Sequence, residues 1–169
     1  GYLHLDTDVS YRDGDAVWMD TVPSSTLVTL GDSSYVNRGI GSGEDASTYI
    51  AYFFSRIEGL QDFGGYLGNN STDGPFIYCG FKPAMVIIKE SDADSTNWRI
   101  YDNVRDGFNP SDKYLRSNTN EVDNTGGAVD FLSSGFKIKN TGAENNGSGD
   151  NYIYMAFAES PFISNNRSK

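Results

Sequence analysis

Oxygen-bearing side chains alternate in the stretch "ESDADSTN", residues 90–97, between two apolar runs. A hard cation such as Ca²⁺ prefers converging carboxylate and carbonyl oxygens, so Asp92, Asp94 and Asn97 are the candidate calcium ligands. An EF-hand loop would also need a central Gly and a Glu at its twelfth position, and this stretch has neither. A plain hairpin turn explains the same residues without a metal. The sequence favours the turn, and no cofactor is predicted.

A second polar loop, "YLGNNSTDGPF" at residues 66–76, offers groups that could bind a sugar. The ring of Tyr66 could stack on a sugar face, as aromatic rings do on flat apolar surfaces. Hydrogen bonds could come from Asn69, Asn70 and Asp73. An ordinary surface turn accounts for these residues equally well and is the favoured interpretation, so the four remain candidate glycan ligands.

Catalytic groups are scarce in this chain. His4 and Cys79 are the single histidine and cysteine, which removes most Ser-His-Asp, Cys-His and zinc sites. A glycosidase needs two carboxylates, one with a raised pKa, and there are 23 acidic residues to choose from. Nearly all of them lie in polar turns, where solvent keeps the pKa ordinary. We therefore predict no catalytic residues and no enzymatic activity, with glycan hydrolysis as the alternative.

The residues that follow the acidic stretch are expected to be structural. Trp98 begins an alternating strand and should pack in the core. Asp102 and Arg105 are close enough in sequence to form an ion pair that holds the loop after this strand.

Composition points to strands rather than helices. Aromatic residues make up 14% of the chain, with 11 Tyr and 10 Phe, and there are 19 Gly, a mixture typical of strands and tight turns. The formal charge of −10 argues against nucleic acid and against an anionic membrane surface. The longest apolar run, "YIAYFF", is far shorter than the ~20 residues that cross a bilayer.

Apolar runs and turn clusters alternate along the chain, as in sandwiches and barrels. We predict an all-β fold, an antiparallel β-sandwich of jelly-roll-like type with about ten to eleven short strands. The continuous run "AMVIIK" predicts a strand central to a sheet. The expected strands are residues 2–5, 15–19, 26–30, 48–57, 76–81, 84–90, 97–102, 113–116, 128–132, 135–140 and 151–158.

An internal repeat organises these strands. "TYIAYFFSR" at 48–56 aligns with "NYIYMAFAE" at 151–159, and two upstream segments agree in the same order. The first copy lacks a counterpart of the hairpin at residues 80–106, which must come from upstream sequence or a neighbouring subunit if it is present at all. The chain, which opens on Gly rather than Met, is expected to be a piece of a longer polypeptide. The predicted organisation is a second half of an incomplete β unit packed on the next unit (1–58), a connector (59–74), a complete β unit (75–162) and a tail (163–169).

Several motifs follow one another in a fixed order along the chain. Their residues are Gly80, Phe81, Pro83, Val86, Lys89, Trp98, Asp102, Arg105, Gly135, Phe136, Tyr152, Ile153, Phe157 and Glu159. This order resembles a domain of unknown biochemical function that recurs in tail-fibre-like and other virion structural proteins of bacteriophages, notably marine ones. The resemblance covers roughly residues 20–162, and the first copy departs from it at Ser55–Arg56. It implies an oligomeric virion appendage module and no reaction.

The predicted function is that of a structural and adhesive module of a phage fibre or surface appendage, virion-bound or extracellular. Its expected partners are copies of itself, other virion proteins or a host surface glycan, without nucleic acid or membrane insertion. A carbohydrate-binding, lectin-like module is the first alternative and a glycan-cleaving tail-fibre domain the second.

Overall fold

The computed structural model describes residues 1–38 and 47–161. These form two compact units. Unit 1 comprises Gly1–Leu3 and Tyr11–Phe54, and unit 2 comprises His4–Ser10 together with the chain from Ser55 onward. The expected tail at 163–169 lies outside the described residues.

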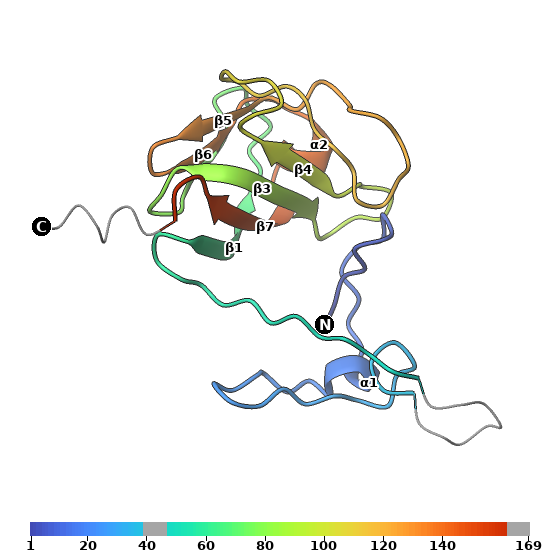
Figure 1. The fold of residues 1–169 in the computed structure, drawn as a ribbon. Coiled ribbons are helices and arrows are strands. Elements are labelled where there is room, and N and C mark those ends of the chain that lie inside the picture. Colours follow the sequence, from blue (N-terminus) through green and yellow to red (C-terminus); the bar gives the residue numbers. More distant parts are fainter. Residues whose placement is uncertain (39–46, 162–169) are drawn as a thin grey trace, which may run out of the picture. The chain divides into compact units, whose positions relative to one another are not determined.

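Unit 2 contains a four-stranded antiparallel sheet with the strand order β1-β7-β3-β4 (Figure 1). The strands are β1 (Gln61–Leu67), β7 (Asn151–Ala158), β3 (Pro83–Glu90) and β4 (Arg99–Asp102). The last strand in sequence, β7, therefore lies inside the sheet and pairs with β1 on one side and β3 on the other. The prediction that the run "AMVIIK" is central to a sheet is confirmed, because β3 lies between β7 and β4.

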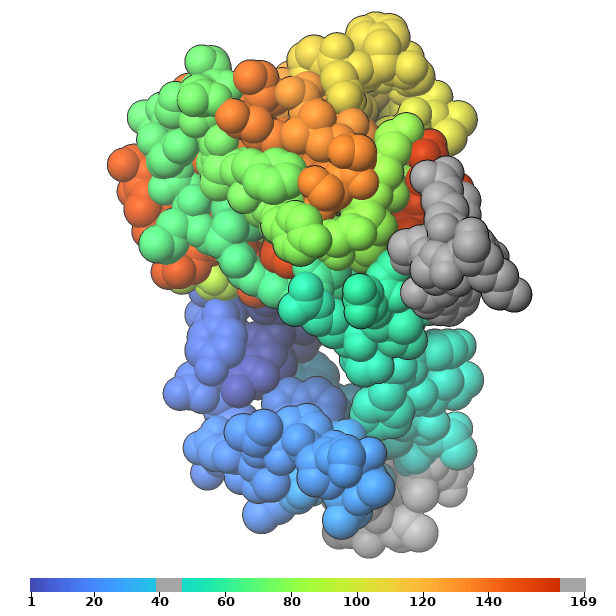
Figure 2. All heavy atoms as spheres, turned by 90° about the vertical axis from the view of Figure 1, so that its left-hand side faces the viewer, coloured from blue at the N-terminus to red at the C-terminus, as the bar shows by residue number. Residues whose placement is uncertain are grey.

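A three-stranded antiparallel sheet completes unit 2, with the order β2-β6-β5. It consists of β2 (Phe76–Tyr78), β6 (Gly135–Ile138) and β5 (Val129–Leu132). One helical turn, α2 (Ala143–Asn146), follows β6 and leads into β7. Strand β2, from the first half of the chain, therefore pairs with β6 from the second half. Figure 2 shows the green β2–β3 segment beside the orange β5–β6 segment on one face of the molecule.

Both sheets contribute to one hydrophobic core. Alternate residues of β3, among them Val86 and Ile88, are buried with Tyr101 of β4, and the other sheet contributes Phe136 and Ile138. Each such side chain stabilises the fold by roughly 1.5–3 kcal/mol on burial. The chain is therefore all-β in its folded core, in antiparallel sheets.

Unit 1 contains little regular structure among its described residues. Its helix α1 (Asp15–Trp18) is a single turn that ends where Met19 adopts a left-handed conformation. Gly31 passes close to this turn, and a Cβ there would lie 1.9 Å from the carbonyl oxygen of Ala16. Val17 is the buried hydrophobic side chain of this unit within the described ranges.

The described residues form seven strands, so the expected ten to eleven is wrong. Residues 15–19 form α1 instead, because Asp15 suits the first turn of a helix and backbone N–H groups of the 31–33 segment take its free carbonyls. Residues 26–30 follow a tight turn without a ladder. Isolated bridges, not strands, occur within 2–5 and 113–116. Within 48–57, Ile57 forms an isolated bridge with Gln61, and residues 48–56 are extended without a strand partner among the described residues. The expected strand 151–158 is confirmed with the same bounds, and five others are confirmed with shifted ends: 76–81, 84–90, 97–102, 128–132 and 135–140.

Strand β1 lies where the sequence predicted only a connector. Its Gly64-Gly65 pair resembles a turn signal, but both glycines face β7 closely. A Cβ on Gly64 would lie 2.9 Å from the Tyr154 hydroxyl, and one on Gly65 would lie 2.9 Å from the carbonyl oxygen of Tyr152. Gly64 therefore makes room for the Tyr154 side chain, and Gly65 allows the two backbones to approach closely.

Candidate functional site

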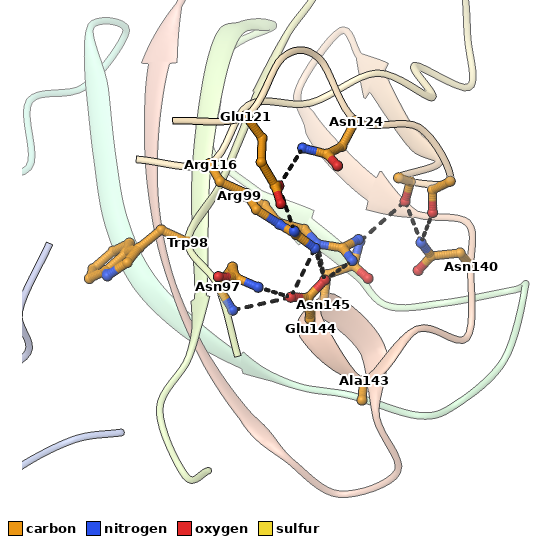
Figure 3. Close-up of polar contacts among 12 residues, drawn as sticks. Asn97, Trp98, Arg99, Arg116, Glu121, Asn124, Asn140, Ala143, Glu144 and Asn145 are labelled. Carbon is orange, nitrogen blue, oxygen red and sulfur yellow. Dashed lines mark hydrogen bonds and ion pairs between the residues drawn. The ribbon is translucent and has the colours of Figure 1, made fainter. Parts of the chain in front are cut away.

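A half-buried carboxylate and two guanidinium groups form a polar cluster in unit 2 (Figure 3). Glu144 from α2 accepts hydrogen bonds from Arg99 of β4, one of them 3.1 Å long from Nε. Arg116 donates to the same carboxylate at 3.2 Å. The side chain of Asn97 adds a third donor at 2.7 Å. Every oxygen of Glu144 is therefore engaged by a donor.

Aromatic side chains surround the two arginines. The guanidinium carbon of Arg99 lies 4.3 Å from the ring centroid of Tyr114, within the range of a cation–π contact. Arg99 also donates to the hydroxyl of Tyr101, and so does the amide of Asn145 at 3.1 Å. Arg116 reaches outward to the more exposed Glu121 at 2.9 Å. The cluster thus links β4, α2 and the long loop after β4.

The pKa values in this cluster favour a structural role. Burial alone would raise the pKa of Glu144, but hydrogen bonds from Arg99 and Asn97 outweigh it and lower the pKa to about 2. A carboxyl group that stays ionised at neutral pH cannot donate a proton there, which a general acid must do. The cluster therefore cross-links β4, α2 and the long loop after β4 by hydrogen bonds and ion pairs.

The candidate calcium ligands bind three separate partners. Asp92 accepts two hydrogen bonds from Asn151, each 2.8 Å long, which lower its pKa. Asp94 accepts the backbone N–H of Ser10 at 2.7 Å. Asn97 belongs to the Glu144 cluster. Across residues 1–38 and 47–161, the structure brings together no group of three His, Cys, Asp or Glu side chains suited to a metal ion.

The candidate glycan ligands hold the loop after β1 in place. Tyr66 stacks on Tyr152, with ring centroids 5.0 Å apart, and its hydroxyl donates to the carbonyl oxygen of Asn145. The side chain of Tyr66 therefore faces the protein. Asn69 exchanges hydrogen bonds with the buried Asn146, at 2.8 and 3.1 Å.

Asn70 and Asp73 of this loop are exposed, and each is bound to a neighbouring segment. The backbone N–H of Asn70 donates to the carbonyl oxygen of Asn146 at 3.0 Å. Asp73 forms an ion pair with Lys137, and this hydrogen bond lowers the pKa of Asp73. The structure thus brings Asn69, Asn70 and Asp73 together on one loop, with Tyr66 turned inward beneath it.

The three residues predicted to be structural each bind a partner within unit 2. Trp98 is buried and its indole N–H donates to the carbonyl oxygen of His4 at 2.8 Å. Asp102 and Arg105 form an ion pair at 3.1 Å, and Arg105 also binds Asp123 at 2.8 Å. Cys79 is a buried thiol whose pKa burial raises to about 12, which makes it a poor nucleophile.

Sequence reasoning missed the Glu144 cluster. Arg99 lies in β4 and is buried on the same face as Tyr101. Its partner Glu144 is 45 residues away, in a turn rich in Asn and Gly. The spacing in sequence holds no sign of this pairing.

Unit 1 presents the second candidate site, an apolar groove of about 610 Å³. Its lining includes Trp18, Val22, Val28, Tyr52 and Phe53. The extended segment beside it, defined here as the 50–53 segment, is among the most exposed apolar stretches described, with Ile50 82%, Tyr52 79% and Phe53 71% exposed. Such a surface suits a protein partner better than a small polar ligand.

Comparison with known proteins assigns the chain to a family but does not indicate an activity. No curated protein matches it, and no solved structure matches it either. None of the helices described is long and apolar enough to cross a membrane. The resemblance to phage virion proteins stays a prediction, because the matching family carries no functional description. That family, described as "Domain of unknown function (DUF7483)", matches residues 1–161, and the chain therefore belongs to it.

Proposed function

We propose that this chain is a structural and adhesive module of a phage fibre or surface appendage, which acts by binding other protein chains rather than by catalysis. The module assembles with copies of itself or other virion proteins, at the virion or outside the cell. In the same proposal, its two antiparallel sheets form a sandwich of jelly-roll-like type. The core to which both sheets contribute supports that arrangement.

The exposed apolar surface of unit 1 is the observation that carries this proposal. Side chains of the 50–53 segment and of the groove stay in contact with water although they are aromatic or aliphatic. Soluble proteins rarely expose contiguous apolar patches of this kind unless a partner covers them. Burial of that surface on association is favourable by roughly 25 cal/mol per Å².

Sedimentation velocity across the micromolar range tests the proposal. We expect the intact chain to self-associate with rising concentration. The double variant Ile50→Ser/Phe53→Ser should stay monomeric. The matched control Val104→Ser/Val122→Ser removes two equally exposed apolar side chains from unit 2 and should associate like the unchanged chain. An intact chain that sediments as a monomer throughout would contradict the proposal.

Carbohydrate binding is the alternative that a specific observation favours. Asn69, Asn70 and Asp73 lie exposed on one loop, and amide and carboxylate groups recognise sugar hydroxyls by hydrogen bonds. A glycan array with the intact chain, beside Asn70→Ala/Asp73→Ala, tests it. Binding that the double variant loses would support a lectin-like role, and an array without binding would rule it out.

A further inference from the structure

Unit 1 reproduces the second half of unit 2 in its backbone pairing. In unit 2, Tyr114 and Asn124 form an isolated antiparallel bridge with reciprocal hydrogen bonds of 3.0 and 2.9 Å. In unit 1, Tyr2 and Arg12 form the same bridge, with two bonds of 2.9 Å. The separation along the chain is the same in both bridges, and a tight turn follows the tyrosine at the same distance.

The turn that contains α2 also has its counterpart. The backbone N–H groups of Asn146 and Asn37 each donate to the carbonyl oxygen four residues earlier, at 2.7 and 2.8 Å. Both side-chain amides donate to the carbonyl oxygen six residues earlier, that of Asn140 at 2.7 Å and that of Gly31 at 3.0 Å. The two asparagines hold the same loop shape by the same bonds.

The tyrosine that begins the repeated strand is anchored in the same way in both units. The hydroxyl of Tyr152 donates to the carbonyl oxygen of Ala143 and accepts the backbone N–H four residues further on, at 2.7 Å. The hydroxyl of Tyr49 donates to the carbonyl oxygen of Ser34 at 2.7 Å and accepts the N–H four residues further on, at 3.0 Å. The segment after Tyr49 is therefore the counterpart of β7.

The surroundings of these two strands differ. Ile153 of β7 pairs with Gly65 of β1 on one side and Lys89 of β3 on the other. Its counterpart Ile50 has no strand on either side among the residues described. Accordingly Tyr152 is 1% exposed and Tyr49 is 43% exposed. Within its described residues, unit 1 holds a β7-type segment in place and offers no strand that would cover it.

We propose that the groove and the 50–53 segment of unit 1 bind a polypeptide segment of the same kind as residues 59–112, the first half of this family's own unit. The proposal rests on the assembly function proposed above and names its partner. The bound segment adds one β1-type strand and one β3-type strand to the two free edges of the 50–53 segment. Backbone hydrogen bonds supply the pairing, and alternate apolar side chains fill the groove, as in strand-addition complexes.

A second copy of this chain cannot supply that segment. Each chain carries one first half, residues 59–112, and two second halves, unit 1 and residues 113–161. The first half is already paired with β7 along both neighbouring strands. If copies of the chain exchanged their first halves, there would still be two second halves for every first half. One second half per chain would therefore stay uncovered. The partner is therefore a first-half segment from outside this sequence.

The experiment provides that segment covalently. A second copy of residues 59–112 is fused directly before Gly1. This junction keeps the native spacing, because Tyr114 lies two residues after residue 112, and its counterpart Tyr2 then lies two residues after the end of the added copy. Hydrogen exchange followed by mass spectrometry then reports on the 50–53 segment. We expect exchange there to slow by about 100-fold, as amides in a paired strand are protected. A matched control carries Val86→Asp and Ile88→Asp in the added copy alone and should remain unprotected.

A second extended chain tests whether the added segment fails to pair only because its side chains do not fit those of the 50–53 segment. In it, residues 48–56 are replaced by the sequence of 151–159, so that the added segment meets the strand it natively pairs with. Protection in either extended chain, absent from the control, supports the proposal. Rapid exchange in both overturns it. Self-association of the unextended chain through the same apolar surface buries side chains without pairing strands, so the amides of the 50–53 segment should still exchange rapidly in it. Slow exchange there in the self-associated, unextended chain would overturn this partner while leaving the assembly function intact.

Discussion

Glu144 is the residue at which the buried charges of unit 2 meet. Its carboxylate neutralises Arg99 and Arg116, both largely shielded from solvent. The substitution Glu144→Gln keeps the shape but leaves Arg99 without its anion and leaves Arg116 with Glu121 alone. We expect a loss of about 2–3 kcal/mol of unfolding free energy, below the full cost of a deeply buried pair because Glu144 keeps some exposure. Urea unfolding followed by Trp98 fluorescence measures it.

Glu121→Gln is the control for this substitution. Glu121 also binds Arg116, but half of its side chain is exposed, so its removal should cost less than about 1 kcal/mol. Equal losses for the two variants would contradict the structural role given to Glu144.

The low pKa of Glu144 also predicts how stability depends on pH. The pKa in the folded state is about 2, against 4.5 for an ordinary glutamate. A group with a depressed folded-state pKa stabilises the fold above its unfolded pKa, and this stabilisation is lost as the pH falls from about 4.5 towards 2. Other carboxyl groups with lowered pKa values, such as Asp106, contribute in the same direction.

The difference between the unchanged chain and Glu144→Gln isolates this one group. We expect the gap in unfolding free energy to be largest near pH 6 and to close progressively between pH 4.5 and about 2. Unfolding curves taken through that range measure it. A gap that stays constant down to pH 2 would show that the charge of Glu144 does not contribute.

At the scale of elements, the junction of α2 with β7 depends on one hydroxyl group. Tyr152 is buried and its hydroxyl satisfies the N–H of Gly147 and the carbonyl of Ala143. Tyr152→Phe should cost about 1–3 kcal/mol, because the N–H of the buried Gly147 and the carbonyl of Ala143 both lose their partner. Tyr49→Phe removes the equivalent hydroxyl from the more exposed tyrosine of unit 1, where water can take its place. It should cost about 0.5 kcal/mol or less.

Denaturant unfolding monitored by near-UV circular dichroism compares the two variants. A cost for Tyr49→Phe equal to that for Tyr152→Phe would mean that unit 1 is already covered in the isolated chain.

Local sequence patterns predicted the strands that can be recognised from their own residues or from a neighbouring strand in the sequence. The strands of the β5–β6 hairpin and the run of β3 have apolar alternation or continuity that the sequence displays directly. The pattern failed where pairing depends on distant residues. Gly64 and Gly65 gave β1 the composition of a turn, and the 50–53 segment has strand composition without a strand to pair with among the described residues.

The candidate site was harder to predict than the sheets. Trp98, Asp102 and Arg105 could be assigned from their own neighbourhood, since each acts within or next to one strand. Arg99 and Glu144 could not, because a buried ion pair between distant elements leaves no periodic signal. The repeat, by contrast, was visible in the sequence, and its hydrogen bonds recur in the structure.

At the scale of the whole molecule, the two units should differ sharply in stability. Unit 2 has the extensive core described above, whereas Val17 is the buried hydrophobic side chain that the described part of unit 1 offers. Amides of β3 and β7 should therefore exchange only through global unfolding, while those of the 50–53 segment should exchange almost as in an unfolded chain. A ratio of at least about 1,000-fold follows from a gap of about 4 kcal/mol in local stability. Hydrogen exchange on the dilute, monomeric chain measures it. Comparable protection in both units would mean that unit 1 is complete by itself, and the need for a covering segment would then disappear.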